Sequence, residues 1–258
     1  MRPRTLGEIL SAAFDIYKAN ASKLILIVAV VVVPLSLLGA LLVQLVAGPN
    51  EETVTILGET QTISDRTFAA IVIGSIIAAI VAVIISAVLQ AAMMRGAALA
   101  TIGDPVDVSD SYRWGLRRFG SVLLVAILVG ITVAIGFILL IVPGIIFLTL
   151  FSVSIPAVVI ENRRGTDAMK RSWNLAKEHF WHVLGVIVVA WIITTVVGSV
   201  LGAIGGDNWF GAWIFSAIAQ IITAPFSALV SVLLYLDLRA RKEALTADSL
   251  RAELASNA

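Results

Sequence analysis

The sequence contains no cysteine. It can therefore form no disulfide, thiolate nucleophile, thiolate-ligated metal site or thioether-linked haem. Charged residues are also scarce, at 14% of the chain against about 25% in soluble domains, whereas hydrophobic residues make up 59%. Such a chain cannot cover itself with polar surface in water, so a lipid bilayer must take up its apolar surface. The formal net charge of +1 gives no support for a nucleic acid partner.

Long stretches without charge predict the membrane spans. Five of them exceed the roughly 20 residues that a helix needs to cross a hydrocarbon core, and residues 119–160 are about twice that length. Inside that stretch lies Val142-Pro143-Gly144, which is typical of a turn because proline lacks an amide donor and glycine permits positive φ. We therefore expect an all-α, polytopic membrane protein with six transmembrane helices arranged as three hairpins.

The predicted boundaries follow from these stretches. The expected spans cover residues 24–48, 67–94, 119–141, 144–160, 181–205 and 210–236. Residues 1–241 form a single membrane domain, and residues 242–258 form a short cytoplasmic tail. A re-entrant hairpin at Pro143, with four full spans, stays open as an alternative.

The positions of lysine and arginine predict the orientation. Of the 18 basic residues, 17 lie before the first span, between spans two and three, between spans four and five, or after span six, and only Arg66 lies elsewhere. Short cytoplasmic segments are enriched in lysine and arginine. We therefore expect a multi-pass protein of the plasma membrane with both termini in the cytoplasm.

A short amphipathic segment precedes each hairpin, at residues 5–18, 107–118 and 166–180, and should lie in the membrane interface. Thr5 and Glu8 in the first segment fit a helix capping box. In the third, Trp173 lies on the apolar face. Basic residues of the second and third segments are the candidates for contact with anionic headgroups: Lys170, Arg171, Lys177, Arg117 and Arg118.

Small residues recur at every fourth position on two spans and predict close helix packing. These stripes are Gly74, Ala78, Ala82 and Ser86 in span two and Gly198, Gly202 and Gly206 in span five. Packing within the chain is the favoured interpretation, and a homodimer face is the alternative. His179 and His182 have the spacing of two metal ligands on one helix, but no thiol accompanies them, so interfacial anchoring is favoured and no metal or cofactor is expected.

Several motifs resemble those of a family of bacterial membrane proteins, common in actinobacteria, named after the membrane domain of glycerophosphoryl diester phosphodiesterases. The residues that carry the resemblance are Arg2-Pro3-Arg4-Thr5-Leu6-Gly7-Glu8-Ile9-Leu10, Phe14, Tyr17, Val142-Pro143-Gly144-Ile145, Pro156-Ala157-Val158-Val159-Ile160-Glu161, Ala168, Arg171-Ser172-Trp173 and Leu234-Tyr235-Leu236-Asp237-Leu238-Arg239. The resemblance covers nearly the whole chain and implies a membrane fold. It implies no phosphodiesterase activity, because that chemistry belongs to a separate soluble barrel whose His-Arg-Gly signature and acidic metal ligands are missing here.

No catalytic constellation is readable in the sequence. No serine has a base and an acid at a readable spacing, no phosphate-binding loop occurs, and no span contains a charge of the kind that proton relays use. We therefore expect a non-catalytic membrane-embedded accessory or scaffold that contacts anionic headgroups and a membrane protein partner. A lipid or small-molecule transporter of permease type is the alternative.

Overall fold

The computed structural model describes residues 3–47, 65–206, 209–243 and 245–256, with side chains for these except 39–47, 65–79, 209 and 247. Within these residues the chain is all α-helical and has no strand. The elements are α1 (Leu6–Ala47), α2 (Asp65–Ile102), α3 (Val108–Leu139), α4 (Ile141–Phe151), α5 (Ser154–Glu161), α6 (Thr166–Ala176), the 3₁₀ helix η1 (Lys177–His179), α7 (Phe180–Gly205), α8 (Trp209–Lys242) and α9 (Ala247–Ser256).

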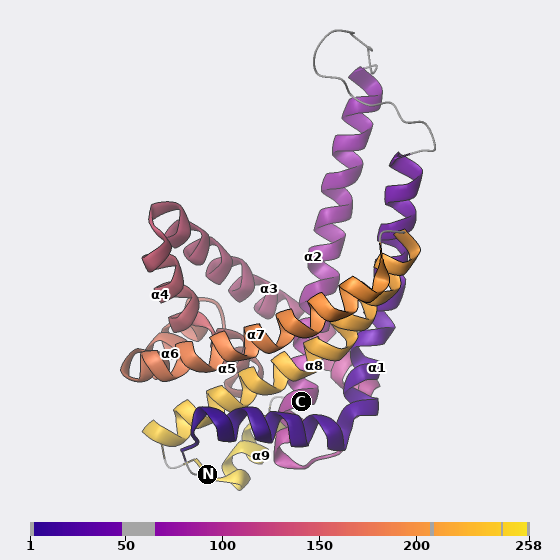
Figure 1. Cartoon of the computed structure of the whole chain (residues 1–258). Coiled ribbons are helices and arrows are strands. Elements are labelled where there is room, and N and C mark those ends of the chain that lie inside the picture. Colours follow the sequence, from indigo (N-terminus) through magenta and orange to yellow (C-terminus); the bar gives the residue numbers. More distant parts are fainter. Residues whose placement is uncertain (1–2, 48–64, 207–208, 244, 257–258) are drawn as a thin grey trace.

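Six segments of the described chain are long and apolar enough to cross a membrane, which confirms the predicted fold class. They are Leu6–Leu38, Ile80–Ile102, Val108–Leu139, Ile141–Glu161, Thr166–Gly205 and Phe210–Lys242. Helices α1 and α2 form one tall pair, α3 and α4 form a hairpin beside it, and α7 and α8 run side by side (Figure 1).

The first described residues contact the end of α8 at the end of the bundle where Figure 1 also shows α9. The backbone N–H of Arg4 donates to the carboxylate of Asp237, and Arg241 Nη2 donates to the Arg4 carbonyl oxygen at 2.7 Å. These contacts place the residues that precede the first helix beside the end of α8.

Helix α1 is bent at Asn20, whose φ of −120° and ψ of 16° are not helical. Residues 6–20, which we call the N-terminal arm, run across the end of the bundle before the helix turns upward (Figure 1). The capping box is confirmed, because Thr5 N–H donates to Glu8 Oε2 at 2.7 Å and Glu8 N–H donates to Thr5 Oγ1 at 3.3 Å. Ile9 and Ala13 are fully buried, so the apolar face of the arm packs on the bundle.

The second amphipathic segment is not a separate helix, contrary to the prediction. Helix α3 continues without a break from Val108 to Leu139. Asp107 caps its beginning by accepting from Asp110 N–H at 2.8 Å, a bond that lowers the pKa of the Asp107 carboxyl. No proline lies between Asp107 and the apolar part of α3, and the amphipathic turns and the span form one continuous helix.

The third amphipathic segment is a separate helix, α6, but a different face is buried from the one predicted. Ala168, Ser172 and Leu175 are fully buried, whereas Trp173 is 38% exposed, with its ring tilted against that of Phe151. The small side chains let α6 approach α4 closely enough for Ser172 Oγ to donate to the Leu150 carbonyl at 2.7 Å. Hydrophobicity favours burial of the tryptophan, but close approach favours the small residues.

The second hairpin, formed by α3 and α4, turns at Leu140, before the predicted Pro143. Leu140 is extended, with φ −165° and ψ 157°, and α4 begins immediately after it. Pro143 lies in the first turn of α4, where a missing amide hydrogen removes no helical bond. The fourth span is also interrupted at Val153, which separates α4 from α5. As a whole, Ile141–Glu161 is long enough to cross a membrane.

The predicted glycine stripe of span five does not lie in a helix seam within the described chain. A Cβ added at Gly198 or Gly202 would meet no atom within 4 Å, and Gly206, with φ of 65°, ends α7. The close approach to α8 occurs instead at Gly205, where a Cβ would lie 3.0 Å from the Gly211 carbonyl oxygen. The repeat of four residues identified a small-residue face, but which face meets α8 depends on the rotation of the packed helix. A homodimer face at Gly198 and Gly202 stays a prediction.

The stripe of span two has a similar outcome. The side chains of Gly74 and Ala78 lie outside the described residues, Ala82 is half-buried and Ser86 is exposed. The buried face of α2 is a neighbouring one, whose small residues are Ala87, Ala91, Ala92, Ala97 and Ala98. There Gly115 of α3 comes so close that an added Cβ would lie 3.0 Å from the Val88 carbonyl oxygen.

Candidate functional site

The most concentrated group of charged side chains surrounds Glu161 at the end of α5. This carboxylate is only 7% exposed, and it accepts from Arg171 of α6 at 3.0 Å (Nε) and 2.7 Å (Nη2). The hydroxyl of Tyr235 in α8 donates to the same oxygen, and Arg239 Nε lies 3.2 Å from it. One carboxylate therefore joins three helices.

Arg239 extends this group to the end of the chain. Its Nη1 and Nη2 donate to the two carboxylate oxygens of Glu253 in α9 at 2.7 and 3.0 Å, the paired geometry that makes arginine–carboxylate bonds strong. Its Nε donates to Glu243 at 3.0 Å. Burial raises the pKa of Glu243, but hydrogen bonds from Arg171 and Arg239 more than offset this, so that pKa lies below its ordinary value. We call Glu161, Arg171, Tyr235, Arg239, Glu243 and Glu253 the charged clamp.

Helix α9 closes this end of the bundle. Leu250 and Leu254 are buried, at 0% and 2% exposure. Arg95 of α2 is 4% exposed, lies 5.7 Å from the Trp114 ring and donates to the Leu254 carbonyl at 3.0 Å, where the C-terminal end of a helix favours a cation. Much of the predicted tail is therefore a docked helix.

A second buried carboxylate, Asp237, organises the contact between the chain ends. Its side chain is fully buried, it accepts from Arg241 Nε at 2.8 Å, and it lies 3.2 Å from His182 Nε2. The two histidines therefore have different surroundings, since His182 contacts Asp237 and His179 does not. Among the described residues, no group of three or more histidine, aspartate or glutamate side chains could hold a metal ion.

The predicted membrane-surface residues divide into two sets. Lys170, Lys177 and Arg117 are exposed, whereas Arg171 lies in the charged clamp and Arg118 donates to the Asn162 side chain. The prediction for Arg171 is therefore wrong, because Glu161, ten residues earlier, and Glu243, 72 residues later, engage its guanidinium. The clamp borders a cavity of about 420 Å³, but every glutamate in it is paired with arginine. The charged clamp therefore holds α5, α6, α8 and α9 together.

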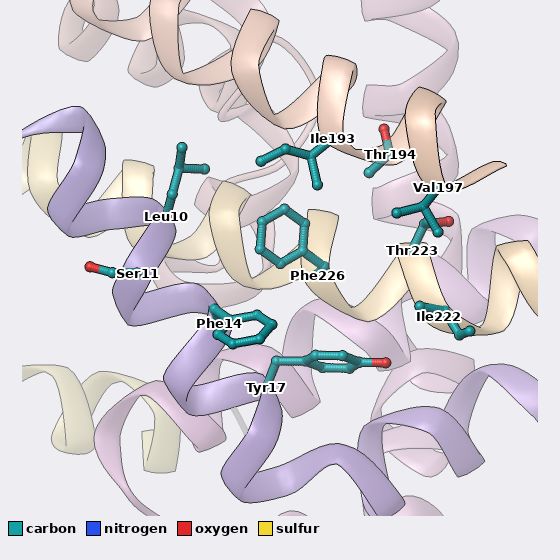
Figure 2. A pocket seen from close by; sticks show the side chains of 10 residues that line it. All are labelled: Leu10, Ser11, Phe14, Tyr17, Ile193, Thr194, Val197, Ile222, Thr223 and Phe226. Carbon is teal, nitrogen blue, oxygen red and sulfur yellow. The ribbon is translucent and has the colours of Figure 1, made fainter. Parts of the chain in front are cut away.

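The apolar site is a groove between the N-terminal arm, α7 and α8, with a volume of about 430 Å³. We call it the lateral groove, and Figure 2 shows the ten side chains that line it. Its lining residues are Leu10, Ser11, Phe14, Tyr17, Ile193, Thr194, Val197, Ile222, Thr223 and Phe226. None carries a charge. Ligand pockets are commonly apolar clefts of about 300–1,000 Å³.

The threonine hydroxyl groups in the wall of the lateral groove are bonded to their own helices. Thr194 Oγ1 donates to the Trp191 carbonyl at 3.0 Å, and Thr223 Oγ1 donates to the Ala219 carbonyl at 2.7 Å. The threonines therefore need no hydrogen bond from an occupant. The groove is suited to a hydrocarbon chain.

The lateral groove opens on the outside of the bundle. Among its lining residues, Phe14 is 54% exposed, Ile193 38% and Ile222 37%. Beside it, α7 presents Val196 and Val200, each 55% exposed. In a bilayer such a surface faces lipid, because exposed hydrophobic side chains of this number would be unfavourable in water. Sequence reasoning did not find the groove, because its residues come from three segments that are far apart in the chain.

Comparison with known proteins identifies a family for this chain but no individual relative. No curated protein and no solved structure matches it. Residues 6–237 match the domain of unknown function DUF7847. That range includes the N-terminal arm, α7 and all of the lateral groove, as well as Asp237 near the end of α8. Because the match spans most of the sequence, this polytopic membrane protein belongs to the DUF7847 family.

Proposed function

We propose that the chain is a non-catalytic membrane protein that holds the acyl chain of a lipid in the lateral groove and acts as a membrane-embedded accessory or scaffold. The observation that carries this proposal is the groove itself, which is apolar, open on the outer surface of the bundle and lined by threonines whose hydroxyls are already bonded to their own helices. An acyl chain is the ligand that a bilayer supplies to such a surface at high concentration.

An acyl chain gains little hydrophobic free energy on moving from the bilayer into the groove, since both surroundings are apolar. Retention must come from closer packing, in which each heavy-atom contact contributes about 0.1–0.2 kcal/mol. Phe14, Tyr17 and Phe226 offer large, flat contact surfaces for this purpose (Figure 2). The groove therefore acts as a positioning surface for lipid.

The exposed basic residues support the scaffold part of the proposal. Lys170, Lys177 and Arg117 are free to approach anionic headgroups, each gaining about 1 kcal/mol near a charged membrane surface. We place this surface on the cytoplasmic side of the plasma membrane. The resemblance to the membrane domain of glycerophosphoryl diester phosphodiesterases is a further part of the proposal, as a likeness of membrane fold without the phosphodiesterase reaction.

Filling the lateral groove should remove the lipid. In Val197→Trp, the indole should occupy the space between α7 and α8, and labelling of the groove by a phospholipid with a photoreactive acyl chain should fall about tenfold, because overpacking costs about 1–3 kcal/mol. Label positions would be mapped by peptide mass spectrometry of the full-length protein in lipid nanodiscs.

Val196→Trp is the matched control, because Val196 is adjacent in sequence but lies outside the groove and is 55% exposed. Its labelling should equal that of the parent. Uniform labelling of every lipid-facing helix, or equal labelling of the two tryptophan variants, would contradict the proposed acyl site.

The proposed orientation can be tested with single cysteines, because the parent has none. We expect Asp110→Cys and Asp167→Cys to react with a membrane-impermeant thiol reagent only after the cells are permeabilised. Thr60→Cys and Asn208→Cys, at positions outside the described residues, should react in intact cells. The readout is the fraction of protein labelled before and after permeabilisation. Labelling of Asp110→Cys or Asp167→Cys in intact cells would reverse the orientation.

A further inference from the structure

A lysine stands at the mouth of the lateral groove. Lys18 Nζ lies 5.4 Å from the centroid of the Phe14 ring, and Phe14 is one of the groove residues. The two side chains are one helical turn apart on the N-terminal arm, so the ring supports the lysine stem while the ammonium group stays exposed. Figure 2 shows Phe14 beside Tyr17, at the edge of the groove formed by the arm.

The charge at this mouth is unopposed within the groove. All ten lining residues from the arm, α7 and α8 are uncharged. On the arm itself, Glu8 is engaged in the capping box, Asp15 is exposed, and Lys23 follows shortly after the bend. Among the described residues, no carboxylate forms an ion pair with the Lys18 ammonium group within 4 Å. An apolar channel with a cation at its entrance has the charge pattern of a lipid with an anionic head.

We propose that the lateral groove and Lys18 together form a site for one anionic phospholipid. Its acyl chain lies between the arm, α7 and α8, and its phosphate oxygens accept hydrogen bonds from the Lys18 ammonium group. This inference rests on the acyl site of the proposed function and adds the class of headgroup. The bend at Asn20 is what makes the site possible, because it holds the arm, and with it Lys18, across the end of the bundle.

The lateral groove and Lys18 recognise different parts of the lipid, because one is apolar and the other is charged. The groove cannot distinguish one lipid from another by head, because it contacts hydrocarbon only. Lys18 makes that distinction by electrostatic attraction, which is weakened by salt at exposed sites. The selectivity for anionic lipid should therefore reside in Lys18, and retention of the chain in the groove.

The test uses two photoreactive phospholipids with the same acyl chain, an anionic phosphatidylglycerol and a zwitterionic phosphatidylcholine, and the full-length protein in nanodiscs. In the parent, the anionic probe should label the groove about fivefold more strongly, and 0.5 M salt should reduce this ratio. Lys18→Gln should bring the ratio close to one while leaving the phosphatidylcholine labelling unchanged. Arg164→Gln, at an exposed basic residue between α5 and α6 that is not assigned to headgroup contact, should keep the parent's ratio.

The possible results separate the two proposals. Loss of groove labelling for both probes in Val197→Trp, with loss of selectivity alone in Lys18→Gln, supports both. If the two probes label the parent groove equally, or if Lys18→Gln keeps the preference, the headgroup site is overturned while the acyl site stands. If neither probe labels the groove of the parent, both are overturned.

Discussion

Replacing Glu161 by glutamine is expected to lower the free energy of unfolding by about 3–5 kcal/mol, the usual cost of removing one partner from a buried ion pair. The side chain of Glu161 is 7% exposed and faces the guanidinium groups of Arg171 and Arg239. Glutamine has nearly the same shape but leaves those charges without their shared carboxylate. The effect can be measured by denaturant titration of the purified protein in mild detergent.

Asp167→Asn provides the control for this change. Asp167 also pairs with a basic residue, Lys170, at 4.0 Å, but the two side chains are 68% and 75% exposed. Exposed pairs of this kind contribute about 0–1 kcal/mol. If Glu161→Gln were no less stable than Asp167→Asn, the charged clamp would not be a stabilising element of the bundle.

Gly136→Ala should also destabilise the protein, by about 1–3 kcal/mol, because it overpacks the hairpin of α3 and α4. An added Cβ would lie 2.8 Å from Phe147 Cδ2 and 2.9 Å from Gly144 Cα. The ring can rotate, but the Gly144 backbone can move only if α4 shifts away from α3. The better helix propensity of alanine, about 0.5–1 kcal/mol, offsets only part of this cost.

Gly130→Ala is the matched variant, since Gly130 lies in the same helix and an added Cβ there meets no atom within 4 Å. It should be neutral or slightly stabilising in thermal unfolding followed by circular dichroism. Equal melting temperatures for the two variants would show that Gly136 does not set the distance between α3 and α4. Comparison at two positions of one helix removes the contribution of helix propensity.

The architecture was predictable because its signals are local. The absence of charge over about 20 residues is a property of one segment, and so is the segregation of basic residues at segment ends. The capping box of Thr5 and Glu8 needs only a spacing of three residues. These signals yielded the all-α class, the count of six apolar segments and the beginning of α1, whereas the placement of both ends on the cytoplasmic side stays a prediction.

The exact turn of the second hairpin, between α3 and α4, was less predictable. Val142-Pro143-Gly144 favours a turn, but proline is also well tolerated in the first turn of a helix. In the structure Leu140 is the extended residue, and Gly144 serves the contact with Gly136 instead. The motif was correct in marking the hairpin, and the packing of two glycines decided where the chain turns.

The charged clamp could not be derived from sequence, because its partners are distant. Tyr235 and Glu161 are 74 residues apart, and Arg171 and Glu243 are 72 apart. A basic residue beside a membrane span fits contact with anionic lipid equally well when no partner is known. Arg171 was therefore assigned to the surface, and only the meeting of α5, α6 and α8 shows that carboxylates occupy it.

The sequence by itself determined that this chain is a membrane protein and how many apolar segments it has. Hydropathy and charge are local properties of each segment, so they can be read without the structure. Tertiary structure alone decided which small-residue faces meet, that Gly205 and Gly136 are contact glycines whereas Gly198 is not, and that a groove exists. The physical reason is that contacts depend on the rotation and bending of helices. The bend at Asn20 brings Phe14 to Ile193 and Phe226, and no pattern within any one of these helices contains that information.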